Sequence, residues 1–283
     1  SISAGEAVRI FTGGVVPSGA DTIVVQEITE RDDERVRVLK AVPVNKHIRR
    51  AGLDFSKGDT LLARGRLLTG RDVMLAAAMN NATIPVTRRA KVAVLATGDE
   101  LVMPGQEPGP GQIVYSNGYA VTALARSEGA DVTDLGIVPD RIEETIAAIR
   151  RAREAGADIL VTTGGASVGD YDLVQKAFAA EGLSLSFWKV ALRPGRPLMH
   201  GLLGVMHVLG LPGNPVSAFV CALLFLVPLL RKLAGQADIV PATESATLGC
   251  AVPANDERAD YVRATLAMGS DGIPVATPFP TQD

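Results

Sequence analysis

Residues 160–172 read LVTTGGASVGDYD, and this stretch decides the expected fold. It opens as an apolar, β-branched run, which is typical of a strand buried on both faces of a sheet. The strand stops at the glycine pair Gly164 and Gly165, and the carboxylates of Asp170 and Asp172 follow soon after. A strand that ends in glycine and leads into acidic side chains indicates a ligand site at the end of that strand.

Similar apolar runs recur on both sides of this stretch, from Lys91 to about Leu233, with helical patterns between them. We expect strands at 91–97, 131–138, 158–163, 186–190 and 204–211. One helix is expected to start after Asp140, which with Glu143 resembles a capping box, and to stop at Gly156. Strands that alternate with helices predict an α/β fold with a central, doubly wound, mostly parallel sheet.

The flanking segments lack this alternation and carry short β-like pieces separated by turn residues, such as RVRVLKAV and YVRATLAM. We therefore expect a multi-domain chain in which small β-rich domains flank the α/β domain. The expected boundaries are 1–58 for a β-rich domain, 59–89 for a helical or extended linking segment, 90–236 for the α/β domain and 237–283 for an incomplete C-terminal β domain.

Composition excludes several classes of function. The net charge of -3 gives no overall attraction for a nucleic acid. The two cysteines form no metal-binding spacing or disulfide framework, so a reducing cytoplasm is expected. The apolar run 216–230 is shorter than the roughly 20 residues of a membrane span and contains Pro228, so we expect a core helix and no membrane partner. No signal peptide is recognisable, and because the chain begins without methionine we expect it to be part of a longer protein.

Four strand ends of the expected sheet carry glycine-rich or polar loops, and the carboxyl ends of parallel strands meet at one edge. These loops hold Thr97, Gly98, Asp99 and Glu100 after the first strand, Asp140 after the second, residues 164–172 after the third, and Pro212, Gly213, Asn214 and Pro215 after the last. Glycine backbone suits phosphate, whereas carboxylates repel phosphate unless a hard cation such as Mg²⁺ lies between them. A phosphate-bearing ligand with Mg²⁺ reconciles both features.

A cationic stretch, WKVALRPGRP at 188–197, lies between the last two of these loops. Its prolines exclude a regular helix, so Lys189, Arg193 and Arg196 are expected on an extended segment that can bind an oxyanion.

Each of these features also has a purely structural explanation. A glycine pair is often a turn, Asp140 is explained as a helix N-cap, and Asn214 before Pro215 is a common helix start. Asp99 and Glu100 could form a solvated turn, and RPGRP could be a surface loop with counter-ions. The three histidines show no ligand spacing. Convergence of all the loops on one sheet edge favours the functional interpretation.

Six motifs in order resemble the molybdenum insertase family, the molybdopterin molybdenumtransferases of the MoeA type, which are related to the E domain of gephyrin. They are RIFTGGVVPSGADTIVVQE, IRRAGLDF, VAVLATGDEL, VTTGGASVGDYD, FWKVALRPGRP and GLPGNPVSA. The resemblance implies that 90–236 binds molybdopterin. It also implies a Mg²⁺-dependent reaction in which molybdate is inserted into adenylylated molybdopterin and AMP is released. A homodimer is implied as well, with molybdopterin adenylyltransferase and molybdoenzymes as transient partners.

The resemblance also suggests residue roles. Candidate catalytic residues are Asp172, Glu100, Lys189, Arg193 and Asp140, of which Glu100, Asp140 and Asp172 are also the candidate metal ligands. Candidate binding residues are Thr12, Asp54, Thr97, Gly98, Asn117, Gly164, Gly165, Ser167, Gly169, Arg196, Pro212, Gly213 and Asn214. The family motif often reads KPGKP where this chain has RPGRP, so planar guanidinium groups stand in place of compact ammonium groups.

Three other functions fit part of the pattern. A molybdopterin adenylyltransferase would have the α/β domain and consume ATP, but the flanking β modules favour the insertase. A gephyrin-like scaffold would keep the fold without catalysis, and the retained acidic and basic residues argue against it. The chain could also fold but be inactive without its missing terminal parts.

Overall fold

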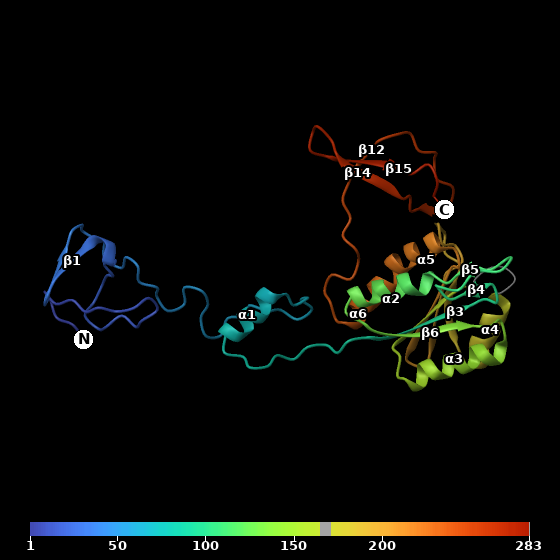
Figure 1. Cartoon of the computed structure of the whole chain (residues 1–283), viewed down its shortest axis with the longest axis horizontal. Coiled ribbons are helices and arrows are strands. Elements are labelled where there is room, and N and C mark those ends of the chain that lie inside the picture. Colours follow the sequence, from blue (N-terminus) through green and yellow to red (C-terminus); the bar gives the residue numbers. More distant parts are fainter. Residues whose placement is uncertain (165–170, 283) are drawn as a thin grey trace. The chain divides into compact units, whose positions relative to one another are not determined.

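The computed structural model describes residues 1–164 and 171–282, and the chain divides into two compact units, Ser1–Leu61 and Leu62–Asp283 (Figure 1). In the first unit a short 3₁₀ helix, η1 (Gln26–Ile28), precedes the strands β1 (Thr29–Asp32) and β2 (Arg35–Val38), which pair antiparallel. Fewer strands form than the β-like pieces predict. The reason lies in packing, because no residue of this unit is buried and strands depend on packed neighbours.

The second unit contains a six-stranded sheet in the order β6-β3-β7-β11-β10-β8. Its strands are β3 (Lys91–Thr97), β6 (Asp131–Val138), β7 (Ile159–Thr163), β8 (Ser184–Trp188), β10 (Met199–Leu203) and β11 (Met206–Leu211). Neighbours β6, β3, β7 and β11 are parallel, and only β10 runs antiparallel to its neighbours β11 and β8. The predicted α/β fold with a mostly parallel sheet is confirmed.

Two details of the sheet differ from the sequence prediction. The strand expected at 186–190 lies at Ser184–Trp188, because Lys189 has a φ of 65° and turns the chain out of the extended conformation. Strand β10 was not expected, and it forms a tight hairpin with β11 through Gly204, whose φ is 63°.

Helices cover both faces of the sheet. On one face lie α2 (Asn117–Ser127) and the continuous helical run of α5 (Pro215–Cys221), the π-helical segment η2 (Ala222–Leu226) and α6 (Val227–Leu233). On the other face lie α3 (Ile142–Glu154) and α4 (Tyr171–Ala180). Each face therefore has its own apolar core, and the doubly wound arrangement follows (Figure 1).

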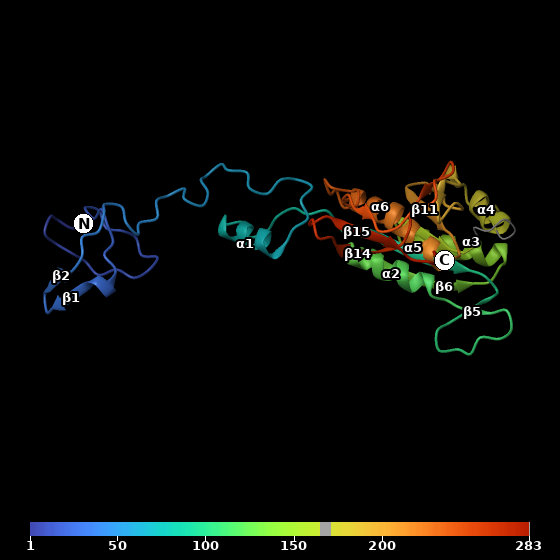
Figure 2. The ribbon, with the colours of Figure 1, turned by 90° about the horizontal axis from the view of Figure 1, so that it is seen from above.

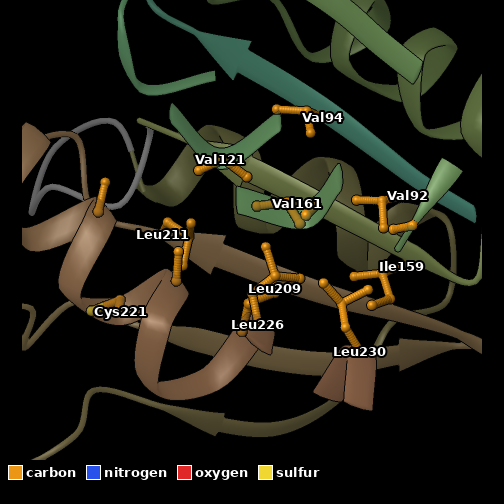
Figure 3. Close-up of a cluster of buried hydrophobic side chains, with 14 of the residues drawn as sticks. Val92, Val94, Val121, Ile159, Val161, Leu209, Leu211, Cys221, Leu226 and Leu230 are labelled. Carbon is orange, nitrogen blue, oxygen red and sulfur yellow. The ribbon is translucent and has the colours of Figure 1, made fainter. Parts of the chain in front are cut away.

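The helical run Pro215–Leu233 is long and apolar enough to cross a membrane by length and composition. In the structure one side of it packs into the core, where Cys221, Leu226 and Leu230 face Ile159 and Leu209 of the sheet (Figure 3). A helix that buries its apolar stripe against a sheet is a core helix, as the sequence predicts.

The second unit also has elements outside the six-stranded sheet and its covering helices (Figure 2). They are α1 (Gly70–Ala78), the two-residue pair β4 (Leu101–Val102) and β5 (Ile113–Val114), and the C-terminal sheet of β12 (Thr247–Leu248), β15 (Pro274–Pro278) and β14 (Ala264–Met268). A further strand, β13 (Ala259–Asp260), pairs in parallel with β9 (Leu192–Arg193). The C-terminal segment is thus joined to the cationic stretch.

Candidate active site

Strands β6, β3, β7 and β11 are adjacent and parallel, so their carboxyl ends lie along one edge of the sheet. The strands end at Val138, Thr97, Thr163 and Leu211. The four loops of the sequence analysis therefore leave the sheet side by side.

Short backbone contacts join these loops. The N–H of Gly98 donates to the carbonyl of Val138 at 3.4 Å. Gly164 has a φ of 88°, and a Cβ there would lie 2.6 Å from the carbonyl oxygen of Thr97. A Cβ on Gly213 would lie 3.7 Å from the Cα of Gly164. Glycine is required at 164 because the backbones of two strand ends approach closely there.

Helix α2 contributes to the same edge through Asn117. Its side-chain Nδ2 donates to the carbonyl of Gly213 at 2.7 Å and so fixes the loop after β11. In that loop Pro212 is buried, and Asn214 caps α5 by accepting from the N–H of Ser217 at 3.0 Å. The structural role of Asn214 as the N-cap of α5 is therefore observed.

The hydroxyl of Thr97 is a further feature of this edge. Thr97 is 1% exposed, and its Oγ1 has no hydrogen-bond partner among the described residues. A buried polar atom without a partner is uncommon and is often satisfied by a ligand or water.

Two of the three predicted metal ligands come from neighbouring loops. The Glu100 carboxylate lies over Gly98, since a Cβ on that glycine would be 2.6 Å from Glu100 Oε2. The backbone N–H of Asp140 donates to Asp99 Oδ1 at 3.2 Å and connects the loops after β3 and β6. The predicted capping role of Asp140 is wrong, because α3 begins at Ile142 and its N-cap is Arg141 without a side-chain cap.

Part of the predicted site cannot be placed. Gly165, Ser167, Gly169 and Asp170 lie outside the described residues. The backbone of Asp172 lies in the first turn of α4, directly after that segment. Among the residues that the structure describes, no three His, Cys, Asp or Glu side chains gather as a metal centre.

The cationic stretch contains no regular helix, as predicted, but it is extended only in part: Leu192–Arg193 form β9, whereas Lys189 and Gly195 have φ values of 65° and 106°. The Nζ of Lys189 lies 3.8 Å from the ring centroid of Trp188, and its backbone N–H donates to Leu198 at 3.0 Å. Lys189 and Arg196 are both exposed. Gly195 is buried and has a φ of 106°, and a Cβ there would overlap the Sγ of Cys221 in α5. The stretch thus rests on α5 at its glycine and exposes its cations.

Arg193 differs from the other two cations because it is already paired. Its Nε and Nη2 donate to the two carboxylate oxygens of Asp260, both at 2.9 Å. The hydrogen bonds that Arg193 donates to Asp260 raise the pKa of Arg193, so this guanidinium stays charged. Sequence reasoning missed Asp260, since only the pairing of β13 with β9 brings it to the stretch.

Thr12 and Asp54 belong to the first compact unit, and both are exposed there. Their predicted contribution to binding stays a prediction.

Two family models match the chain. The first, described as a probable molybdopterin binding domain, covers residues 93–232, and the second, described as the MoeA N-terminal region (domain I and II), covers residues 1–80. The chain belongs to the MoeA family. The expected resemblance is therefore confirmed, and the sheet edge described above lies within the first of these matches.

Curated relatives and solved structures agree with the MoeA assignment. The chain is 39% identical over 240 residues to a molybdopterin molybdenumtransferase of Nostoc sp. This match covers 84% of this chain and 55% of that protein. It is 36% identical over 263 residues to molybdopterin molybdenumtransferase 2 of Mycobacterium tuberculosis, covering 91% of this chain and 65% of that protein. A molybdopterin biosynthesis MoeA protein from Pyrococcus horikoshii matches with a TM-score of 0.75 and 28% identity, over 94% of this chain and 64% of that one. The chain spans less than two thirds of these relatives.

Proposed function

We propose that this chain carries the core of a molybdopterin molybdenumtransferase, which inserts molybdate into adenylylated molybdopterin and releases AMP. The observation that carries the proposal is the sheet edge at which Thr97, Gly98, Gly164 and Gly213 come together beside Glu100 and Asp140, in a chain of the MoeA family. Glycine backbone can accommodate phosphates, and Glu100 and Asp140 belong to loops that leave the same edge.

Mg²⁺ fits this set of residues as a shared ion. Mg²⁺ commonly takes one or two protein carboxylates and completes its shell with substrate phosphate oxygens and water. Glu100 and Asp140 are the candidate ligands on the loops after β3 and β6, and Asp172 at the start of α4 is a third candidate. When bound, Mg²⁺ would neutralise phosphate charge and polarise the bond that releases AMP.

The residues of the chain divide the remaining work. Asn117 holds the loop after β11, so that the backbone at Gly213 is fixed before a ligand arrives. Lys189 and Arg196 are exposed cations of the cationic stretch, and we assign them to molybdate and phosphate charge. Arg193 joins them with an orientation that Asp260 fixes. We propose that Thr12 and Asp54 of the first unit also take part in substrate binding, as the family resemblance implies.

The setting of the reaction follows from the same proposal. We propose a cytoplasmic enzyme that acts as a homodimer, receives its substrate from a molybdopterin adenylyltransferase and passes its product to molybdoenzymes. Both cysteines are free thiols, with Cys221 buried and Cys250 exposed, which suits a reducing compartment.

The test is AMP release from adenylylated molybdopterin, measured with and without molybdate at several Mg²⁺ concentrations. The Nostoc relative, whose chain is longer, serves as the positive control. Molybdate-dependent release by this chain supports the proposal. Binding of the substrate without release, while the relative turns over, would exclude catalysis by this chain.

A substitution tests the acidic residues within the same assay. Asp172→Asn is expected to reduce Mg²⁺-dependent turnover by at least about tenfold while changing the free energy of unfolding by less than about 0.5 kcal/mol, because the substitution keeps the size of the side chain. Asp131→Asn, at the opposite end of the sheet, is the matched control. Normal turnover of Asp172→Asn at equal Mg²⁺ would remove Asp172 from the site.

A further inference from the structure

Asp260 faces Arg193 because the backbone fixes it there. In the parallel pairing of β13 with β9, Asp260 is in register with Arg193. The N–H of Ala259 donates to Ala191 at 2.9 Å, and the N–H of Tyr261 donates to Arg193 at 2.7 Å, so hydrogen bonds flank the acidic residue on both sides. Because the two residues occupy paired positions on neighbouring strands, the backbone alone brings their side chains together.

The ion pair occupies only one edge of the guanidinium. Nε and Nη2 donate to Asp260, whereas Nη1 has no hydrogen-bond partner in the described part of the chain. A guanidinium presents its donors in a rigid planar fork, so fixing one edge fixes the direction of the other. Arg193 is therefore ordered with a free N–H edge.

Asp256 does not play the same role, although it lies in the same cluster. Its oxygen is 3.7 Å from Nη2 of Arg193, but it pairs closely with Arg258, at 2.5 Å between Nη2 and Oδ2. Hydrogen bonds from Arg258 lower the pKa of Asp256 to about 2. Asp256 is thus engaged by Arg258, and Asp260 is the bidentate partner of Arg193.

Exposure indicates what the pair with Asp260 does. The Arg193 side chain is 47% exposed and that of Asp260 is 20% exposed, and ion pairs at such sites contribute little to stability. Orientation is a different matter, because an arginine side chain that is ordered before binding loses less freedom when a ligand arrives. The ion pair of Arg193 with Asp260 has no net charge, but Lys189 and Arg196 bring two further cations to the same stretch.

We propose that Asp260 is a positioning residue for oxyanion binding, which holds the guanidinium of Arg193 by its Nε and Nη2 edge and directs the Nη1 edge to the oxyanion. The proposal rests on the proposed function, because it takes the cationic stretch as the binding place of molybdate. It makes the C-terminal segment part of the substrate site.

A double-mutant cycle tests this role. Asp260→Asn is expected to raise the KM for molybdate about fivefold with kcat changed less than twofold, which corresponds to about 1 kcal/mol of binding. With Arg193→Lys already present, Asp260→Asn should change KM less than twofold, because an ammonium has no planar edge to direct. Asp256→Asn makes the same charge change in the same cluster and should also stay below twofold.

Three results would overturn the proposal. A lower KM in Asp260→Asn would mean that the carboxylate competes with the oxyanion for Arg193. An equal rise of KM in the arginine and lysine backgrounds would mean that Asp260 acts through the fold. An unchanged KM would mean that Asp260 has no role in binding.

A binding assay without turnover separates this proposal from the proposed function. Trp188 is the only tryptophan, and the Nζ of Lys189 lies over its ring, so tryptophan fluorescence can follow molybdate titrated into the chain without pterin. If wild type binds molybdate but releases no AMP, the proposed function fails, and the fivefold shift in Kd still decides the role of Asp260. If wild type releases AMP and the Asp260 variant behaves identically, only the role of Asp260 fails. Wild type that neither binds molybdate nor releases AMP overturns both.

Discussion

The cationic stretch depends on a glycine, and Gly195→Ala tests that dependence. Gly195 is buried with a φ of 106°, a conformation that residues with a Cβ rarely adopt. A methyl group at 195 would overlap Cys221 Sγ and would lie 3.0 Å from Cδ1 of Leu192. Both neighbours are buried in the core against the sheet, so neither can move aside easily.

Two contributions set the expected loss of stability. A β-carbon in the left-handed region costs about 1–2 kcal/mol. Forcing a methyl group into a packed core costs about 1–3 kcal/mol more. We therefore expect Gly195→Ala to lower the free energy of unfolding by about 2–5 kcal/mol, a large share of the roughly 5–15 kcal/mol that stabilises a domain.

Two further variants separate these contributions in urea unfolding experiments. Gly204→Ala is the control for the backbone alone, because Gly204 has a φ of 63° and a Cβ there would meet no atom within 4 Å. It should cost only about 1–2 kcal/mol. Cys221→Ala removes the overlapping sulfur and should cost about 1 kcal/mol by itself. In Gly195→Ala/Cys221→Ala the new methyl takes the place of the sulfur, so the double variant should recover about 1–3 kcal/mol relative to the sum of the single variants.

The reasoning would be refuted in either of two ways. Gly195→Ala could cost no more than Gly204→Ala, in which case the contact with Cys221 carries no strain. The two substitutions at 195 and 221 could also be additive, which would show that the methyl and the sulfur do not compete for one space. We also expect Gly195→Ala to bind molybdate more weakly in titrations, because Arg193 and Arg196 on either side of the glycine would move. Unchanged molybdate binding by Gly195→Ala would likewise contradict the reasoning.

Three further predictions concern single interactions. Lys189→Ala should raise the molybdate concentration for half-maximal turnover about tenfold without weakening pterin binding. The control is Lys91→Ala, at the start of β3 and so at the sheet edge away from the site, which should change neither quantity. An unchanged molybdate dependence in Lys189→Ala would remove Lys189 from the site. Burial lowers the pKa of both His200 and His207, whose Nε2 and Nδ1 atoms lie 3.1 Å apart. The unfolded chain therefore binds protons at a higher pH than the folded chain, and stability should fall as the pH drops below about 6.5. His207→Gln should flatten this dependence of the urea midpoint between pH 7.5 and 5.5, and an equal slope would contradict the prediction. Glu128→Gln should lower the free energy of unfolding by about 1–2 kcal/mol, because Arg231 of α6 donates two hydrogen bonds of 2.8 Å to the partly buried Glu128 at the end of α2. The control is Asp131→Asn, whose exposed ion pair with Arg89 is 3.7 Å long, and it should cost under about 0.5 kcal/mol. Equal losses would exclude a special role for the pair of Glu128 and Arg231.

The α/β fold was predictable because its strands are short and apolar and its helices carry clear stop signals. β3 and β6 lie at the bounds expected from their apolar runs, and Gly156 follows the last turn of α3 as predicted. Strand β10 was missed because MHGLL mixes polar and apolar residues, and only its pairing with two neighbours makes it a strand. Asp140 looked like a cap because its spacing to Glu143 fits, but Arg141 adopts the extended conformation that precedes the helix.

The site was predictable only where its residues follow strands. Thr97, Gly164 and Gly213 could be placed together in advance, since parallel strands end at one edge and glycine marks close approach. Asp260 could not, because it is far along the chain from Arg193 and belongs to no motif that the sequence analysis identified. In the sequence Cys221 is likewise one apolar residue of a core helix, although its Sγ is the atom against which Gly195 of the cationic stretch packs. Both residues act through a partner rather than on a ligand, so their roles depend on tertiary contacts. Motifs therefore indicate which groups meet the substrate, and the contacts behind them indicate which residues hold those groups in place.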